Sequence, residues 1–209
     1  MRTRSKVVLI AALGLMPQVV GAQAGEEART GLGPLAGFSR TTTTGDTVSD
    51  WRPAFTLGLQ LRHAFRSGAF VRTGLAYSLR GAGWTEGGFT SYLNLQYLEV
   101  PILFGYGLRP TARVRPFAMA GAQLGLLLKC TVSAVLVSVK CDDASDPRSV
   151  ARTDLALVGG GGVELAVHRG TVTVDARYVL GIVDIEKESG ARNRGYTLAV
   201  SYTLPISRR

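Results

Sequence analysis

The sequence predicts an all-β protein, and within that class an eight-stranded antiparallel up-and-down transmembrane β-barrel. Eight segments alternate apolar and polar residues, which is the pattern of strands with one apolar face. Their connections alternate long and short, as in membrane barrels with long outer loops and short periplasmic turns. No segment after the N-terminal region is apolar for long enough to cross a membrane as a helix. If the mature chain enters a membrane, only a closed barrel is therefore open to it.

Residues 1–24 have the features of a secretory signal peptide. Basic residues near the start precede an apolar run over 7–16, and Ala22-Gln23-Ala24 has the small-x-small pattern found before a cleavage site. A membrane-anchor helix is the alternative, but the apolar run is short and Pro17 interrupts it. We therefore expect cleavage after Ala24, a barrel domain over 25–209 and a location in the bacterial outer membrane.

The first three strands are expected over 31–40, 54–65 and 71–80. The first is a weak, glycine-rich strand, separated from the second by a polar loop over 41–53. The second and third strands alternate clearly and are joined by the tight turn Arg66-Ser67-Gly68, so they form a hairpin.

The fourth strand, over 93–106, carries a charged residue in the middle of an otherwise apolar segment. Glu99 lies on the face opposite the apolar one, which would be the lumen in a membrane barrel. The apolar residues change phase within the strand, which predicts a β-bulge near Tyr97–Leu98. The glycine-rich segment 81–91 before it is expected to be a loop.

The second half of the chain supplies the remaining four strands. They are expected over 115–128, 152–168, 171–178 and 196–204. The longest loop, over 129–150, contains Cys130 and Cys141. An exported chain favours a disulfide between these two cysteines, closing the outer loop.

The turns predict which charged residues face each other. A turn centred on Ser67 places Arg62 opposite Arg72. If Arg169-Gly170 is a two-residue turn, Glu164 lies opposite Asp175. Like charges directly opposite one another are destabilising unless another group neutralises them.

We expect the two like-charged pairs to neutralise each other across the lumen. In an eight-stranded ring, strands two and three lie across from strands six and seven, and the interior is only wide enough for side chains to fill. Arg62 and Arg72 should then reach Glu164 and Asp175. The same turn places Gly162 opposite Arg177, and Gly160 and Gly162 should make room for Arg177. Glu99 is expected as a further carboxylate towards the outside. The alternative is that each charge is separately hydrated in a wet lumen.

No pattern in the sequence indicates a catalytic, metal or cofactor site. His63 and His168 have no plausible partner set for a triad or a metal site, and no Gly-Lys-Ser or Gly-Lys-Thr follows Gly159–Gly162 to make a phosphate loop. The formal net charge is +9, but the basic residues are dispersed, so nucleic-acid binding is not expected.

Four blocks in order resemble the PorT-like outer-membrane β-barrel family. They are Tyr97-Leu-Glu-Val-Pro-Ile-Leu, Arg115-Pro-Phe-Ala-Met-Ala-Gly-Ala, Gly160-Gly-Gly-Val-Glu-Leu and Val174-Asp-Ala-Arg-Tyr-Val-Leu-Gly-Ile. The resemblance runs from about residue 30 to the end of the chain. It implies a small eight-stranded barrel of a kind usually without known enzymatic activity, and PorT itself is associated with protein secretion. The segment Asn193–Val200 is similar to the signal by which such barrels are recognised for insertion, although it lies inward of the chain's end.

The sequence therefore favours a non-enzymatic barrel that anchors or displays loops, or assists an envelope complex. Its expected partners are outer-membrane lipid, the barrel-assembly machinery during insertion and an envelope protein bound through the outer loops. A small outer-membrane channel and a soluble lipocalin-like ligand-binding barrel remain the alternatives.

Overall fold

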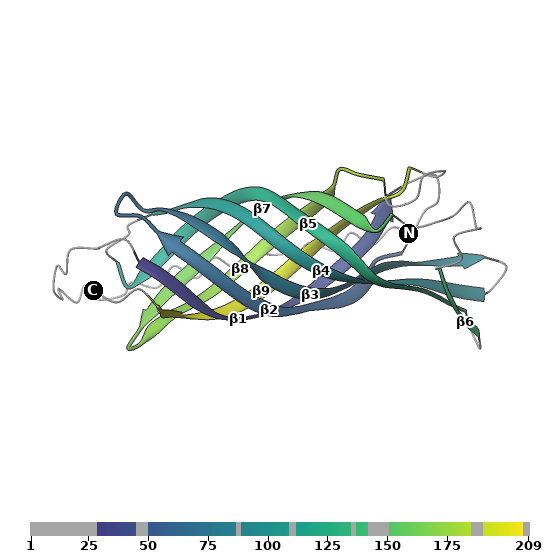
Figure 1. Cartoon of the computed structure of the whole chain (residues 1–209), viewed down its shortest axis with the longest axis horizontal. Helices are drawn as coiled ribbons and strands as arrows, with labels where there is room; N and C mark the ends of the chain where they lie inside the picture. The colour runs from purple at the N-terminus through teal and green to yellow at the C-terminus, as the bar shows by residue number, and fades with distance from the viewer. Residues whose placement is uncertain are drawn as a thin grey trace, which may run out of the picture.

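The computed structural model describes residues 29–44, 50–86, 89–108, 112–134, 137–141, 151–184 and 190–206. Nine strands make up nearly all of this part of the chain (Figure 1). They are β1 (Arg29–Thr44), β2 (Arg52–Ala64), β3 (Ala69–Glu86), β4 (Phe89–Gly107), β5 (Val114–Ala134), β6 (Val137–Lys140), β7 (Thr153–Val167), β8 (Gly170–Gly181) and β9 (Arg192–Pro205). The expected signal peptide and its cleavage site lie outside the described residues.

Eight of these strands close into a ring in which each pairs antiparallel with its neighbours. The pairing runs from β4 back through β3, β2 and β1 to β9, β8, β7 and β5, and the β4–β5 pairing closes it. A closed ring satisfies the backbone hydrogen bonds of every strand within the membrane, where water is absent. The predicted eight-stranded up-and-down barrel is confirmed. The four-residue strand β6 is an addition that pairs with β5 beyond the ring.

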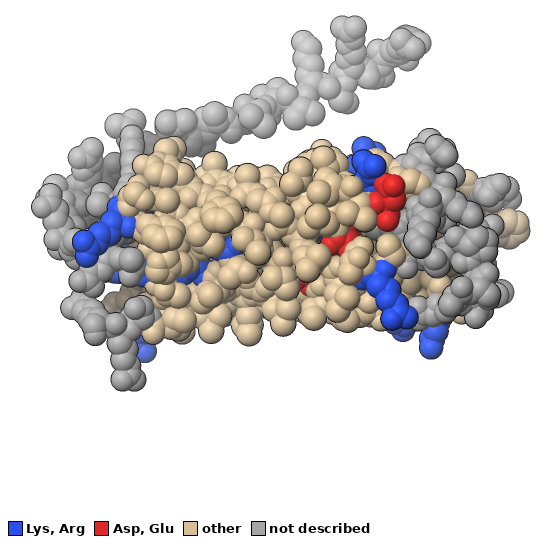
Figure 2. Space-filling view, turned by 45° about the horizontal axis from the view of Figure 1, so that its top comes forward, with Lys and Arg blue, Asp and Glu red and all other residues tan. Residues whose placement is uncertain are grey.

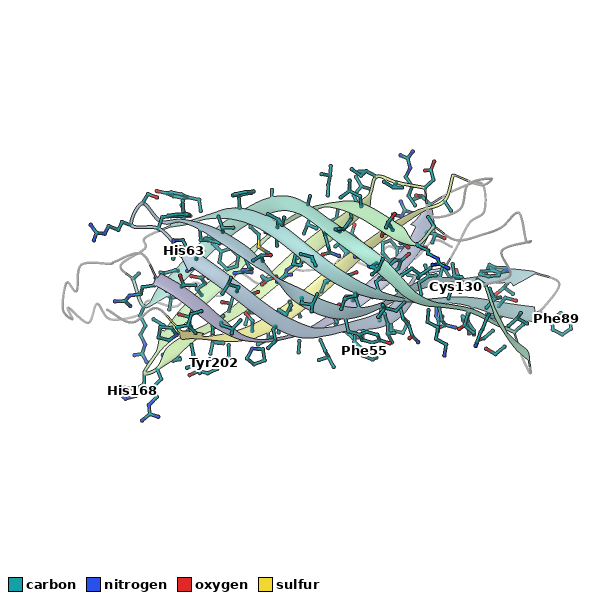
Figure 3. The ribbon with its side chains drawn as sticks, viewed as in Figure 1. Phe55, His63, Phe89, Cys130, His168 and Tyr202 are labelled. Atoms are coloured by element: carbon teal, nitrogen blue, oxygen red, sulfur yellow. A yellow bond between two sulfur atoms is a disulfide. The ribbon has the colours of Figure 1, made fainter. Side chains whose placement is uncertain are left out.

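The outer face of the ring is apolar and the lumen is polar. On β2, Phe55, Leu57 and Leu59 are 45%, 53% and 56% exposed, whereas Gln60 between them and the turn is 2% exposed. Phe55 points away from the barrel in Figure 3. The visible face in Figure 2 is mostly uncharged, with basic and acidic side chains standing out towards its ends and a few charged atoms visible between them. This arrangement is inverted relative to a soluble barrel and suits a lipid environment. None of the described residues forms a helix long and apolar enough to span a membrane.

The strands at the outer end continue further than the sequence predicts. The prediction of a loop over 81–91 was wrong, because β3 and β4 remain paired from Gly81–Asn94 to Glu86–Phe89. By contrast, the β2–β3 ladder extends only as far as Thr56–Ser78, and beyond it a single bridge joins Asp50 to Gly83 among the described residues. The ends of β3, β4 and β5, together with β6, therefore form a sheet that projects beyond the complete ring (Figure 1). We call this part, residues 81–86, 89–96, 129–134 and 137–140, the outer sheet.

A β-bulge lies beside Tyr97, as predicted, but its additional residue is in β5 and not in β4. The register changes from Gln96–Lys129 to Tyr97–Leu127, so the additional residue is Leu128. The predicted phase change within β4 was wrong, because Leu95 and Tyr97 are fully buried on the same face as Glu99. Apolar residues occupy the lumen at this level, and for this reason the apolar pattern predicts the wrong phase.

The disulfide between Cys130 and Cys141 is confirmed. It lies one residue pair beyond the β5–β6 ladder, and the amide of Cys141 donates to the carbonyl of Cys130 at 3.3 Å. Cys130 is 2% exposed and belongs to a buried apolar cluster with Leu95 and Tyr97. The disulfide thus joins the outer sheet to the apolar layer at the outer end of the lumen.

Replacement of Leu59 by Arg should reduce the free energy of unfolding by about 2–4 kcal/mol, because it places a charge in the middle of the apolar outer face. Urea-induced unfolding in lipid vesicles, followed by the shift between folded and unfolded bands on a gel, measures the effect. Leu204→Arg, near the end of β9, is the matched control and should cost about 0–1 kcal/mol. An equal loss of unfolding free energy at the two positions would contradict the assignment of the apolar outer face to the membrane.

Digestion without reducing agent, followed by mass spectrometry, should recover Cys130 and Cys141 in one linked peptide. A disulfide that closes a loop of this size gives a stabilisation of about 3 kcal/mol in the chain-entropy treatment. This stabilisation should act mainly on the outer sheet. Reduction should therefore increase proteolysis within residues 129–141 and leave the heat-dependent gel shift of the ring unchanged. Free thiols in the folded protein would refute the pairing.

Candidate functional site in the barrel lumen

The register of β2 and β3 brings two arginines side by side in the lumen. Arg62 pairs with Arg72 across the hairpin, as the turn at Ser67 predicts. Both side chains point inwards because the outward positions of these strands are apolar. Arg72 is 1% exposed, so its charge must be met by other lumen groups.

The register of β7 and β8 differs from the predicted one by two residues. Glu164 pairs with Thr173, and the expected pairing of Glu164 with Asp175 was wrong. The reason is the turn, which is made by His168 and Arg169, while Val167 and Gly170 already form the first strand pair.

The same shift changes the partners of the two glycines. Asp175 pairs with Gly162 and Arg177 pairs with Gly160, so the expected pairing of Gly162 with Arg177 was also wrong. A Cβ atom on Gly160 would lie 3.0 Å from the Cα of Arg177, and one on Gly162 would lie 2.8 Å from the Cβ of Asp175. Both glycines therefore provide space directly beside the charged residues.

Five of the predicted residues form one group, which we call the inner cluster: Arg62, Arg72, Glu164, Asp175 and Arg177. Arg62 Nε lies 2.6 Å from Glu164 Oε1, and Arg72 Nη1 lies 2.9 Å from Asp175 Oδ2. Arg72 Nη2 is also 3.6 Å from Glu164 Oε1. Arg177 donates to both carboxylate oxygens of Asp175, from Nε to Oδ1 and from Nη2 to Oδ2 at 3.1 Å. The ion pairs thus connect β2 and β3 with β7 and β8 across the lumen.

Aromatic side chains enclose the inner cluster. The rings of Phe70 and Phe117 meet edge to face with centroids 5.5 Å apart. The guanidinium carbon of Arg72 lies 5.4 Å and 4.9 Å from these two centroids, and that of Arg62 lies 4.6 Å from Phe70. Such contacts favour a cation over the ring face and exclude water from around it.

Glu99 belongs to a second group, the outer cluster, with Arg80, Asp154, Asn193 and Tyr97. Arg80 Nε lies 2.7 Å from Glu99 Oε1, and its Nη1 lies 3.4 Å from Asp154 Oδ2. Asn193 Nδ2 donates to Asp154 Oδ2 at 3.0 Å. Arg80 and Asp154 were not predicted as members of this cluster. The signal was present for Arg80, which lies eight residues after Arg72 on the same face of β3.

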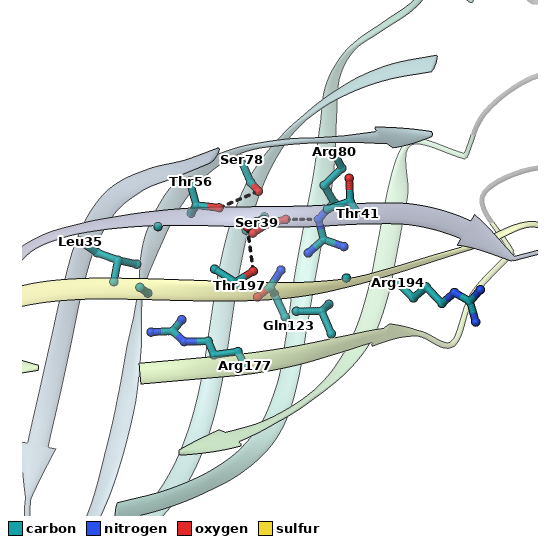
Figure 4. Close-up of a pocket in the computed structure, with 15 residues that line it drawn as sticks. Leu35, Ser39, Thr41, Thr56, Ser78, Arg80, Gln123, Arg177, Arg194 and Thr197 are labelled. Atoms are coloured by element: carbon teal, nitrogen blue, oxygen red, sulfur yellow. Dashed lines mark hydrogen bonds and ion pairs between the residues drawn. The ribbon is translucent and has the colours of Figure 1, made fainter. Parts of the chain in front are cut away.

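Short polar side chains fill the lumen between the two clusters. Gln60 Nε2 donates to Ser201 Oγ at 3.1 Å, and the hydroxyls of Ser39 and Thr197 lie 2.8 Å apart. Figure 4 shows the small cavity at this level, with Arg80 and Arg177 extending from opposite ends. Its volume is about 30 Å³, which is small and leaves space for ordered water.

The two histidines lie away from both clusters, at the opposite end of the barrel from Cys130 (Figure 3). His63 Nδ1 lies 2.8 Å from the hydroxyl of Thr30, and its ring meets Phe65 edge to face. His168 is an exposed turn residue. Within the described part of the chain, no group of three or more His, Cys, Asp or Glu side chains is placed to hold a metal ion.

A closed eight-stranded ring with an apolar outer face and a charged, side-chain-filled lumen defines a small integral outer-membrane barrel. The chain belongs to the outer membrane protein beta-barrel domain family, whose model matches residues 22–187. No curated protein sequence matches the chain.

Solved structures of small outer-membrane proteins are similar in fold. The outer membrane protein OprG from Pseudomonas aeruginosa is 10% identical with a TM-score of 0.54, covering 88% of this chain and 99% of its own. Neisserial surface protein A is 14% identical with a TM-score of 0.50, covering 85% and 99%. Ail, the attachment invasion locus protein of Yersinia pestis, is 18% identical with a TM-score of 0.45, covering 86% and 100%. The likeness to OprG and to Neisserial surface protein A shows a shared fold and nothing more specific.

Replacement of Asp175 by Asn should reduce the free energy of unfolding by about 3–5 kcal/mol, because it leaves Arg72 and Arg177 buried without their main counter-charge. Combination with Arg72→Gln should cost less than the sum of the two single replacements, since the residues contact each other directly. Unfolding in lipid vesicles measures all three variants.

The exposed ion pair between Arg192 and Asp184 is the matched control. Its atoms lie 2.7 Å apart, but its side chains are 51% and 43% exposed. Arg192→Gln should therefore change the free energy of unfolding by about 0–1 kcal/mol. Strict additivity of the Arg72 and Asp175 replacements would show that the lumen charges are separately hydrated.

Proposed function

We propose that this protein is a non-enzymatic, non-conducting outer-membrane barrel that anchors the outer sheet at the cell surface, as a display or accessory component of an envelope complex. The filled lumen is the observation that supports this role. The inner cluster, the outer cluster and the polar layer between them occupy the ring at successive levels, and the cavity between the clusters has a volume of only about 30 Å³.

A constitutive channel and a soluble ligand-binding barrel are both less compatible with this arrangement. A channel needs a continuous aqueous path, whereas Arg72, Glu164 and Asp175 are at most 2% exposed. A soluble lipocalin-like barrel binds its ligand in an apolar lumen and keeps its outer face polar, and here the two faces are reversed.

The outer sheet has the features of a surface for a protein partner. Phe89 and Val139 are 67% and 60% exposed, and Tyr92, at 40%, has the guanidinium of Arg52 over its ring at 4.4 Å. Aromatic residues and arginine are enriched in protein interfaces. An accessory role in secretion or assembly, of the kind that the resemblance to PorT-like barrels implies, would use this surface.

The purified protein should give no stable unitary conductance in planar bilayers, at concentrations at which a general porin inserts and conducts. Circular dichroism and the heat-dependent gel shift on the same preparation establish that the barrel is folded. The double variant Arg72→Ala/Arg62→Ala, which removes two of the side chains that fill the lumen, serves as a positive control and should raise the frequency of current steps. Stable conductance of the unmodified protein would overturn the proposal in favour of a small channel.

A further inference from the structure

A groove on the lipid-facing side of the barrel is not used by the lumen or the outer sheet. It crosses β1, β9, β8 and β7 and has a volume of about 420 Å³, within the range of roughly 300–1,000 Å³ that is usual for small-ligand sites. Its lining is nearly all apolar, with Phe38, Leu198, Tyr178 and Tyr196 as the large side chains and Gly159 and Ala176 as small ones.

The groove results from a change in side-chain size between neighbouring strands, from large aromatic residues to glycine and alanine. Tyr196 pairs with Tyr178, and Tyr178 pairs with Gly159, so two aromatic rings stand beside a position without a side chain. Two residue pairs further along, on the same face, Leu198 pairs with Ala176. A Cβ atom on Gly159 would have no atom within 4 Å, so the space above this glycine is open.

One exposed arginine lines the outer end of the groove, and a second, Arg194, lies outside its lining, against Trp51. Arg40 lines the groove, is exposed, and pairs across the strands with Tyr196. The ring of Trp51 stacks on Tyr196 with centroids 5.5 Å apart, and the guanidinium carbon of Arg194 lies 5.6 Å from the Trp51 ring. Strand β1 ends at the same end of the barrel as β6 (Figure 1), so this is the outer half of the membrane.

We propose that this groove binds one bisphosphorylated glycolipid of the outer leaflet, with an acyl chain over Gly159 and Ala176 and its phosphates on Arg40 and Arg194. An exposed arginine on a lipid-facing strand is costly in hydrocarbon unless an anionic group meets it near the interface. Guanidinium groups bind phosphate oxygens in bidentate geometry, and aromatic side chains favour the headgroup level. Arg40 pairs with Tyr196, and Arg194 lies two residues before Tyr196 on the same strand, so two basic groups adjoin this residue. Two such groups suit a lipid with two phosphates better than a phospholipid with one. The site is independent of whether the lumen conducts.

Displacement of a brominated lipid from Trp51 tests the assignment. In a Trp84→Phe background Trp51 is the only tryptophan, and brominated phosphatidylglycerol bound in the groove should quench its fluorescence. Lipid A should restore the fluorescence at lower concentrations than unlabelled phosphatidylglycerol, dephosphorylated lipid A or phosphatidylcholine. Arg40→Gln should weaken the effect of lipid A about tenfold, as expected for the loss of a charged hydrogen bond. Gly159→Phe should also weaken the displacement by lipid A, because the new ring fills the space proposed for the acyl chain.

Two matched controls separate the groove from general membrane effects. Lys129→Gln removes an exposed basic residue from β5, and Leu75→Phe enlarges an exposed apolar residue on β3, and both should leave the displacement unchanged. The heat-dependent gel shift verifies that each variant is folded. Equal displacement by lipid A and phosphatidylglycerol would overturn the assignment to the bisphosphorylated lipid. Unchanged displacement in both Arg40→Gln and Gly159→Phe would overturn the site itself.

Discussion

The narrow interior of an eight-stranded ring is the constraint on which the rest of this structure depends. Such a ring leaves space for side chains but not for a column of water, so a charged residue in the lumen must be neutralised by another side chain. Arg72, 1% exposed, contacts Asp175 on β8 and Glu164 on β7. Since β3 lies across the ring from these strands, each contact fixes the relative positions of opposite walls.

The two lumen clusters differ in the sign of their excess charge. In the inner cluster three arginines surround Glu164 and Asp175, and Arg115 adds a fourth at 3.8 Å from Glu164. In the outer cluster Arg80 alone contacts both Glu99 and Asp154. The two groups therefore attract each other along the barrel axis, through a layer of uncharged polar side chains. The lumen is held together both across the ring and along it.

Alternation was sufficient to predict the ring, because a one-residue shift in any strand would exchange lipid-facing and lumen-facing side chains. It was insufficient for details that depend on local geometry. The choice between His168-Arg169 and Arg169-Gly170 as the turn changes the pairing of β7 and β8 without changing either apolar face. Leu95 and Tyr97 were misleading because they are apolar residues that face inwards, where they cover the disulfide. Arg80 was missed as a partner of Glu99 because its contact is diagonal, since Glu99 pairs directly with Ala76.

The same strands that complete the ring also carry the outer sheet, and this continuity links the lumen to the proposed surface role. Strands β3, β4 and β5 run from the membrane into the outer sheet, and the bulge at Leu128 lies where β5 has already left its pairing with β7. Bulges increase local bending and twist, which allows these strands to leave the cylinder while they remain paired with one another. The ion pairs that close the lumen therefore also fix the base of the outer sheet. A partner bound to Phe89 or Tyr92 would be held in a defined orientation relative to the membrane, which a flexible loop could not provide.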